Sequence, residues 1–456
     1  MADTRGFEMA HDLTQGNETK SILLFAVPMM IGNLFQQVYN IVDTIIVGKY
    51  VGAGALAAVG SSYTLMVFLT SIILGLCMGS GVVFSQLFGA RQAEKLKHAI
   101  LLSFAFIALV TLAINLASIL LIEQILWFLR IPPDILGLTR EYLWIIFYGI
   151  GFTFLYNYFS AVLRSIGDSV TPLCFLALSA LLNVGLDLLF VVPLGMGVGG
   201  AALATVIAQG VSALLIAVYC YCKAPELRPG RRHLQLDRPL LGRIVSYSAL
   251  SSVQQSIMNF GILMIQGLVN SFGVQVMAAF AAAVKIDSFA YMPVQDFGNA
   301  FSTYIAQNLG AGKRERIQNG IRSSVRAATL FCLIISAAVV VFARPLMCIF
   351  VDPGELEILS IGVQYLRIEG ACYCGIGYLF LLYGLYRGLG RAGMSVVLTV
   401  ASLGTRVAIA YLFAPLPAFG LLAIWWAIPI GWAFADLIGF FYYRRHKDSL
   451  LPSLSV

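Results

Sequence analysis

The chain has 456 residues, of which 59% are hydrophobic and only 11% are charged, and its mean hydropathy is +0.87. A soluble domain carries about 25% charged residues, so this composition excludes a soluble globular fold and places most of the chain in lipid. The net charge of +7 at pH 7 would suit nucleic-acid binding, but the basic residues gather in loops, so we expect no nucleic-acid partner.

Apolar stretches long enough to cross a hydrocarbon core of about 30 Å recur along the whole chain. The first 20 residues are polar and lack the order of a cleaved signal peptide, so we expect the first apolar stretch to direct membrane insertion. We predict twelve membrane-spanning helices, at 20–47, 54–86, 98–122, 138–164, 169–194, 199–222, 240–271, 276–308, 318–342, 358–388, 393–414 and 418–443.

The Lys and Arg residues orient these spans. An even number of spans places both ends of the chain on the same side of the membrane. Most basic residues outside the spans fall on that side, whereas Lys49, Arg140 and Arg344 are among the few on the opposite side. Because basic loops stay in the cytoplasm, this bias predicts a multi-pass protein of the cell (inner) membrane with both termini cytoplasmic.

The second half of the chain repeats the pattern of the first half. Residues 85–96 align with residues 306–317 at a shift of 221, which places Gln86 on Gln307. Both copies begin on the same side of the membrane, so the repeats are parallel, and two bundles with a central seam suit alternating access. We expect an N-terminal six-helix bundle at 1–222, a polar cytoplasmic linker at 223–239 and a C-terminal six-helix bundle at 240–456.

Two acidic residues lie deep in the spans of the first half, where a charge costs several kcal/mol. They are Asp43 in the first span and Asp187 in the fifth span, one helical turn after Asn183 on the same face. Thr205 lies at a matching depth in the sixth span. The carboxylate, amide and hydroxyl oxygens form a set of hard ligands suited to a proton or Na⁺. The structural alternative is a polar cluster that only joins the helices.

Pro28 lies inside the first span and removes one backbone hydrogen bond, so we expect a helix bend there. A bend in the helix that carries Asp43 could couple proton binding to helix shape. A static kink is the alternative.

The second half carries charges of both signs. Lys285 and Asp287 lie two residues apart in the eighth span and so point to different faces, and Glu369 and Arg406 lie in the tenth and eleventh spans. Opposite charges on separate helices predict interhelical pairs. Polar, Tyr and Met side chains could line an adaptable substrate cavity, although most such residues simply pack. The candidate substrate-binding residues are Gln36, Tyr39, Gln255, Asn259, Lys285, Asp287, Met292 and Glu369.

No catalytic or nucleotide-binding motif is present in the sequence. It contains no H-E-x-x-H, no G-x-S-x-G and no G-x-x-x-x-G-K-[ST] pattern. The eight cysteines lie almost wholly inside apolar runs, where we expect small hydrophobic side chains rather than metal ligands. We therefore expect a protein that is not an enzyme, needs no cofactor and draws its energy from a gradient of H⁺ or Na⁺.

An ordered set of short motifs along nearly the whole chain resembles the multidrug and toxic compound extrusion (MATE) transporters. The motifs are Val42-Asp-Thr-Ile-Ile-Val-Gly48, Leu182-Asn-Val-Gly-Leu-Asp187, Gly200-Ala-Ala-Leu-Ala-Thr205, Ala281-Ala-Ala-Val-Lys-Ile-Asp287, Gln307-Asn-Leu-Gly-Ala-Gly-Lys313 and Leu385-Tyr-Arg-Gly-Leu-Gly390.

The resemblance implies an all-α polytopic membrane protein whose twelve helices form two pseudo-symmetric bundles around a V-shaped central cleft. It also implies that Asp43, Asn183, Asp187 and Thr205 form the ion-coupling site, as a proton or Na⁺ site of the first bundle. Some branches of the family carry an acidic residue in the seventh helix, where this chain has uncharged side chains. An ion site in the second bundle would therefore depend on Asp287 or Glu369.

We predict a cation-coupled antiporter that exports small amphipathic, cationic organic compounds and works as a monomer in the lipid bilayer. The wider superfamily also contains flippases for lipid-linked saccharides, which is the alternative function. An enzyme would instead turn over its substrate without any ion gradient.

Overall fold

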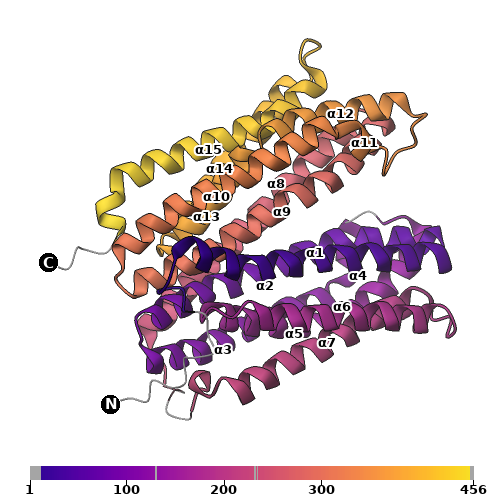
Figure 1. Ribbon diagram of the computed structural model, residues 1–456. Helices are drawn as coiled ribbons and strands as arrows, with labels where there is room; N and C mark the ends of the chain where they lie inside the picture. Colours follow the sequence, from indigo (N-terminus) through magenta and orange to yellow (C-terminus); the bar gives the residue numbers. More distant parts are fainter. Residues whose placement is uncertain (1–11, 129–130, 231–232, 234, 452–456) are drawn as a thin grey trace. The chain divides into compact units, whose positions relative to one another are not determined.

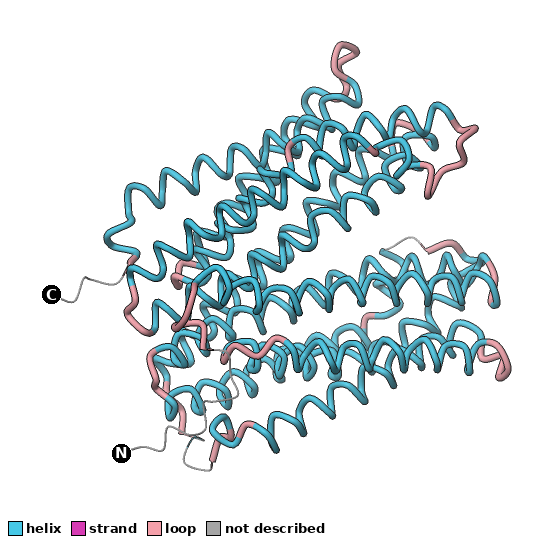
Figure 2. Tube along the Cα trace, in the orientation of Figure 1, coloured by secondary structure: helices cyan, strands magenta, loops and turns pink. Residues whose placement is uncertain are grey.

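The computed structural model describes residues 12–451 except 129–130, 231–232 and 234. Within that part of the chain every regular element is a helix, as the sequence predicted (Figure 2). The two ends that we place in the cytoplasm, residues 1–11 and 452–456, lie outside the described residues.

The long helices of the first half pack side by side (Figure 1). They are α1 (Glu18–Tyr50), α2 (Ala53–Gly89), α3 (Ala93–Leu120), α4 (Ile122–Phe128), α5 (Pro133–Ser165), α6 (Val170–Val191) and α7 (Gly197–Lys223). Helix α5 packs against α2 and α7, and α6 packs against α7. Fully buried aromatic side chains such as Phe147 and Tyr158 of α5 fill the core of this half.

The second half continues with another set of long helices. They are α8 (Arg238–Asn270), α9 (Val274–Gly310), α10 (Arg314–Val341), α11 (Ala343–Met347), α12 (Leu356–Ala371), α13 (Tyr373–Gly388), α14 (Ala392–Phe413) and α15 (Gly420–Leu450). Helix α9 packs against α12 and α13, and α14 packs against α15. The fully buried Trp425 stacks on Phe280 with 5.7 Å between ring centroids, which joins α15 to α9.

Helix lengths confirm the internal repeat. Helices α2 and α9 both have 37 residues, α3 and α10 both have 28, and α6 and α14 both have 22. A glycine at positive φ precedes α2 and α9 alike: φ is 112° at Gly52 and 104° at Gly273. Only glycine adopts this conformation readily, so the same turn recurs at equivalent positions of the two halves.

The largest difference between the halves lies in α5 and its counterpart. Helix α5 runs unbroken for 33 residues, whereas its counterpart is split at Cys372 into α12 and α13, which are bent by 53°. The break lies beside Glu369 at the end of α12 and Tyr373 at the start of α13.

The helices agree with the predicted membrane topology. Ten described helices are long and apolar enough to cross a membrane, and the bent pair α12–α13 adds one further span. Helix α8 has 33 residues but is more polar, because it carries Gln254, Gln255 and Asn259. Counted with α8, these helices match the twelve predicted spans in chain order, and the chain is a multi-pass membrane protein.

The chain divides into two compact units. The first contains Ile31–Ser252, and the second contains Leu13–Met30 and the chain from Val253 onward. Helices α1 and α8 therefore each contribute to both units. The domain boundaries proposed from the sequence, at residues 222 and 240, and the V-shaped cleft stay predictions.

Candidate functional site

The four residues proposed for ion coupling come together within the first unit. Asn183 and Asp187 lie one turn apart on α6, where they are 2% and 0% exposed. Thr205 of α7 accepts a hydrogen bond from Asn183 Nδ2 at 3.3 Å and donates one to the carbonyl oxygen of Ala201 at 3.1 Å. Asp43 of α1 lies within interaction range of Asp187. The helix-turn spacing on α6 thus brings the carboxyl and amide groups to one place.

Four buried oxygens of this site have no hydrogen-bond donor among the described residues. Among the described residues, no donor reaches Asp43 Oδ1, Asn183 Oδ1 or either carboxyl oxygen of Asp187, and all of these atoms are buried. Two ionised carboxylates do not share a buried site unless a cation lies between them. The arrangement is therefore suited to hold one proton or one small cation.

Tyrosines surround the carboxyl pair. Tyr142 of α5 lies close enough to interact with both acids, and Tyr39 of α1 interacts with Asp43 and with Gln36, which precedes it by three residues. The sequence did not single out Tyr142, because nothing in its local pattern shows which face of α5 meets α1 and α6. Helix α1 runs without interruption through Pro28, so the functional bend at that proline remains a prediction.

A second acidic cluster lies in the second unit. Asp287 of α9 and Glu369 of α12 are 6% and 1% exposed and interact with each other. Tyr373 donates a hydrogen bond to Asp287 Oδ1 at 2.6 Å, and Arg406 of α14 is near both acids. The helix break at Cys372 presents Glu369 and Tyr373 to the same carboxyl group. Charged residues of three helices lie near one another here, and an ion pair between Arg406 and either acid stays a prediction.

Lys285 lies apart from that cluster. Its ammonium group lies over the ring of Phe350, 5.8 Å from the centroid, whereas Asp287 bonds to Tyr373. The two-residue spacing of Lys285 and Asp287 predicted that their side chains point in different directions.

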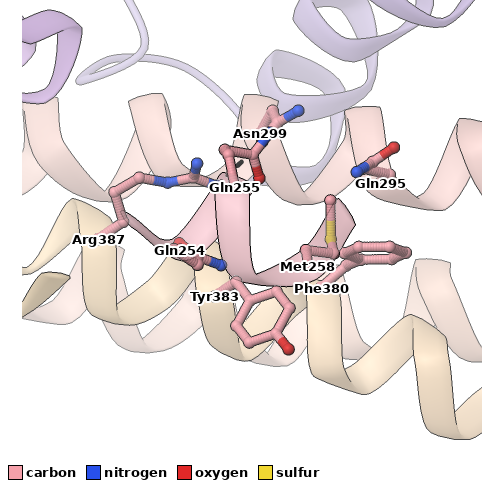
Figure 3. Close-up of a pocket in the computed structure, with 8 residues that line it drawn as sticks. All are labelled: Gln254, Gln255, Met258, Gln295, Asn299, Phe380, Tyr383 and Arg387. Carbon is pink, nitrogen blue, oxygen red and sulfur yellow. Dashed lines mark hydrogen bonds between the residues drawn. The ribbon is translucent and has the colours of Figure 1, made fainter. Parts of the chain in front are cut away.

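A small pocket opens within the second unit between α8, α9 and α13 (Figure 3). Its polar lining consists of four amides and one guanidinium, and its apolar lining of a thioether and two aromatic rings. The lining residues are Gln254, Gln255, Met258, Gln295, Asn299, Phe380, Tyr383 and Arg387. Arg387 donates a hydrogen bond to Asn299 Oδ1 at 2.9 Å, so α13 and α9 are joined across the pocket.

The pocket contains Gln255 but not the other candidate substrate residues of the second half. Asn259, Met292, Asp287 and Glu369 do not line it, and Gln36 and Tyr39 lie in the first unit. Their substrate role stays a prediction. The sequence carries a partial signal for this pocket, since the paired amides in the middle of the seventh predicted span stand out in an apolar segment.

Comparison with known families agrees with the internal repeat. The sequence profile of the MatE family matches residues 28–189 and 249–412. The two matched stretches begin 221 residues apart, which is the shift that aligns the two halves, and each covers most of one half.

Individual relatives match over nearly the full chain. The Probable multidrug resistance protein YpnP of Bacillus subtilis (strain 168) is 32% identical over 441 residues, which cover 95% of this chain and 97% of that protein. YoeA of the same organism is 28% identical over 437 residues, with 93% of each chain covered. A solved MOP superfamily transporter from Pyrococcus furiosus has the same fold, with a TM-score of 0.91 at 24% identity over 99% of both chains. The chain therefore belongs to the multidrug and toxic compound extrusion (MATE) family of membrane transporters.

Proposed function

We propose that this chain is a secondary active antiporter that exports amphipathic, cationic organic compounds in exchange for H⁺ or Na⁺ by alternating access. The pair Asp43 and Asp187 carries the proposal, because Asp43 Oδ1 and both carboxyl oxygens of Asp187 are buried and lack donors among the described residues. The names of the Bacillus subtilis relatives, which are multidrug resistance proteins, support the substrate class.

The carboxyl pair supplies a mechanism for exchange. An ion changes a conformational equilibrium only if it binds one conformation more tightly than the other. A proton or Na⁺ that enters from outside reduces the negative charge of the pair and favours substrate release. When the ion leaves toward the cytoplasm, the negative charge returns and favours a cationic substrate. Ion and retained substrate therefore exclude each other.

We further propose that the protein acts as a monomer in the cell (inner) membrane with both termini cytoplasmic. The proposed orientation is supported by the excess of Lys and Arg in the loops on the side of the termini. In this orientation the substrate leaves the cytoplasm while the ion enters it across the same bilayer.

Replacing the acids tests the coupling. In cells that express the protein, Asp43→Asn and Asp187→Asn are expected to reduce efflux of ethidium to the level of cells without the transporter. The amide has nearly the same shape but binds neither a proton nor Na⁺ well. Asp134→Asn, at an exposed acid in the first turn of α5, is the matched control and should export at the wild-type rate. The coupling role is wrong if the folded acid variants export as the wild type does.

The same cells distinguish the flippase alternative. An exporter lowers dye accumulation and raises resistance to cationic dyes. A flippase for lipid-linked saccharides would leave dye accumulation unchanged and would instead support envelope synthesis.

A further inference from the structure

The pocket between α8, α9 and α13 concentrates polar groups inside the membrane-spanning part of the second unit. Amides from two helices line it: Gln254 and Gln255 of α8, and Gln295 and Asn299 of α9 (Figure 3). Gln254 is only 3% exposed. Buried amides are costly unless they form hydrogen bonds, and apolar side chains would pack such a position more simply. The amides therefore suggest a site for a polar ligand group.

Arg387 supplies the charge of the pocket. It is 5% exposed and is the last residue but one of α13, at the end of the span, where long basic side chains usually reach outward to water. Here Gly384 and Gly388 allow α13 to approach α9 closely, which keeps the Arg387 side chain inside the unit. A Cβ at Gly384 would lie 2.3 Å from the carbonyl oxygen of Gly298, and one at Gly388 would lie 2.6 Å from that of Ser302. Because both glycines let α13 touch α9, the guanidinium comes to lie beside Asn299.

Arg387 carries the one charge among the described residues that line the pocket. No acidic side chain is among the described residues that line the pocket. Two acids are near: Asp296 follows Gln295 on α9, and Asp436 interacts with Tyr383 from α15, but neither contributes to the lining. In a medium of low dielectric constant such a lining favours an anion and disfavours a cation.

The other side of the pocket is apolar. Met258, Phe380 and Tyr383 line it, and Tyr291 stacks behind Phe380 with 6.2 Å between ring centroids. The pocket is small, with room for about one small functional group of a substrate. A flat guanidinium pairs with a carboxylate through two parallel hydrogen bonds.

We propose that this pocket binds the carboxylate of an amphipathic export substrate, with Arg387 and the surrounding amides as donors. The proposal rests on the proposed function for the identity of the ligand as an export substrate, and it narrows the substrate class. The preferred compounds are zwitterions, in which a carboxylate accompanies the cationic centre and an aromatic body.

Two dyes that differ by one group test this assignment. Rhodamine 110 carries a free carboxylate, and rhodamine 123 is its methyl ester with the same ring system. Their binding to the purified full chain in detergent is measured by fluorescence polarisation, without any ion gradient. The wild type is expected to bind rhodamine 110 about tenfold more tightly, the size of one charge-assisted hydrogen-bonded contact. Failure of ion coupling would not affect this binding ratio, so the two proposals fail separately.

Substitutions in the lining test whether the preference for rhodamine 110 arises in this pocket. Arg387→Gln should abolish the preference for rhodamine 110 while leaving rhodamine 123 binding within about twofold, and Arg387→Lys should keep part of it. Asn299→Asp places a carboxylate against Arg387 and should abolish the preference without removing the buried arginine. Arg391→Gln, an exposed position one turn beyond, is the control and should behave as the wild type.

Three results would overturn the assignment. The first is a wild type that fails to bind rhodamine 110 or binds both dyes equally. The second is an Arg387→Gln protein that loses affinity for both dyes by the same factor, which would indicate a structural role. The third is a folded Asn299→Asp protein that keeps the full preference, and this outcome remains decisive if Arg387→Gln does not fold.

Discussion

At the scale of single residues, the contact between α9 and α13 depends on glycine. Gly384 faces the carbonyl oxygen of Gly298, and neither position has room for a methyl group. Close helix contacts through small residues are the usual means by which membrane helices associate, since lipid provides no hydrophobic drive between them. The α9–α13 contact is therefore a principal source of stability in the second unit.

Gly384→Ala is expected to destabilise the protein. The added methyl group would lie 2.3 Å from a backbone oxygen, so the helices must separate, at a cost of about 1–3 kcal/mol. The midpoint of thermal unfolding in detergent measures the effect. Gly404→Ala, in α14 with open space around it, is the control and should leave the midpoint unchanged or raise it. Equal midpoints for the two variants would show that the contact is not tight.

The residues that could be predicted from the sequence are those whose depth and helical spacing are visible there. Asn183 and Asp187 stand out because polar side chains one turn apart interrupt an apolar span. Arg387 resembled one more basic residue at a cytoplasmic span end, and its burial depends on the glycine contact of another helix. Tyr142 was missed for the same reason, since its role depends on the rotation of α5 relative to its neighbours.

At the scale of elements, the segment before α1 is held by the end of α9 and the start of α10. Leu13 N–H donates to Gln307 Oε1 at 3.2 Å, and its carbonyl oxygen accepts from Asn308 Nδ2 at 3.2 Å. Arg316 donates to the carbonyl oxygen of Gly16 at 2.7 Å. The repeated motif at residues 306–317 thus has a structural role, because it binds the segment that leads into α1.

The equivalent contact recurs in the first unit. The segment before α8 reaches the start of α3, where His233 lies 3.2 Å from Glu94 and His98 contacts the carbonyl oxygen of Gln235 at 2.5 Å. Arg243 in the first turns of α8 bonds to Gln86, the counterpart of Gln307. Each half therefore has the same kind of anchor at the cytoplasmic end proposed for it.

Leu13→Ala is expected to weaken the first of these anchors. Leu13 is fully buried, and truncation of a buried leucine costs about 2–5 kcal/mol. We expect a lower midpoint of thermal unfolding for the full-length protein. Leu236→Ala, at a leucine that is 62% exposed in the equivalent segment, should have no effect. A Leu13→Ala protein as stable as the wild type would mean that the segment is only loosely attached.

Among the elements, the break between α12 and α13 is the feature that we did not predict from the sequence. The tenth predicted span covers both α12 and α13, and no proline lies near Cys372 to indicate a break. The bend instead accompanies the buried contact of Glu369 and Tyr373 with Asp287. Long-range contacts of this kind are not encoded in local hydropathy, so the number of spans was predictable and this break was not.

At the scale of the whole molecule, two copies of one scaffold carry different chemistry. Most long helices of the two halves match in length and order, but no base is among the described residues that interact with the acidic pair of the first unit, whereas the second unit holds acids together with Arg406. The repeated scaffold provides the frame that the proposed alternating access requires. We propose that coupling is confined to the first unit, while the second recognises substrate.

Substrate movement in proteoliposomes under imposed ion gradients tests this central claim most directly. Efflux of ethidium is followed with a pH gradient alone, with a Na⁺ gradient alone and with neither. We expect one of the two gradients to accelerate dye movement, and the folded double variant Asp43→Asn, Asp187→Asn to lose that acceleration entirely. Dye movement that is independent of both gradients, or an undiminished response in the double variant, would contradict the account.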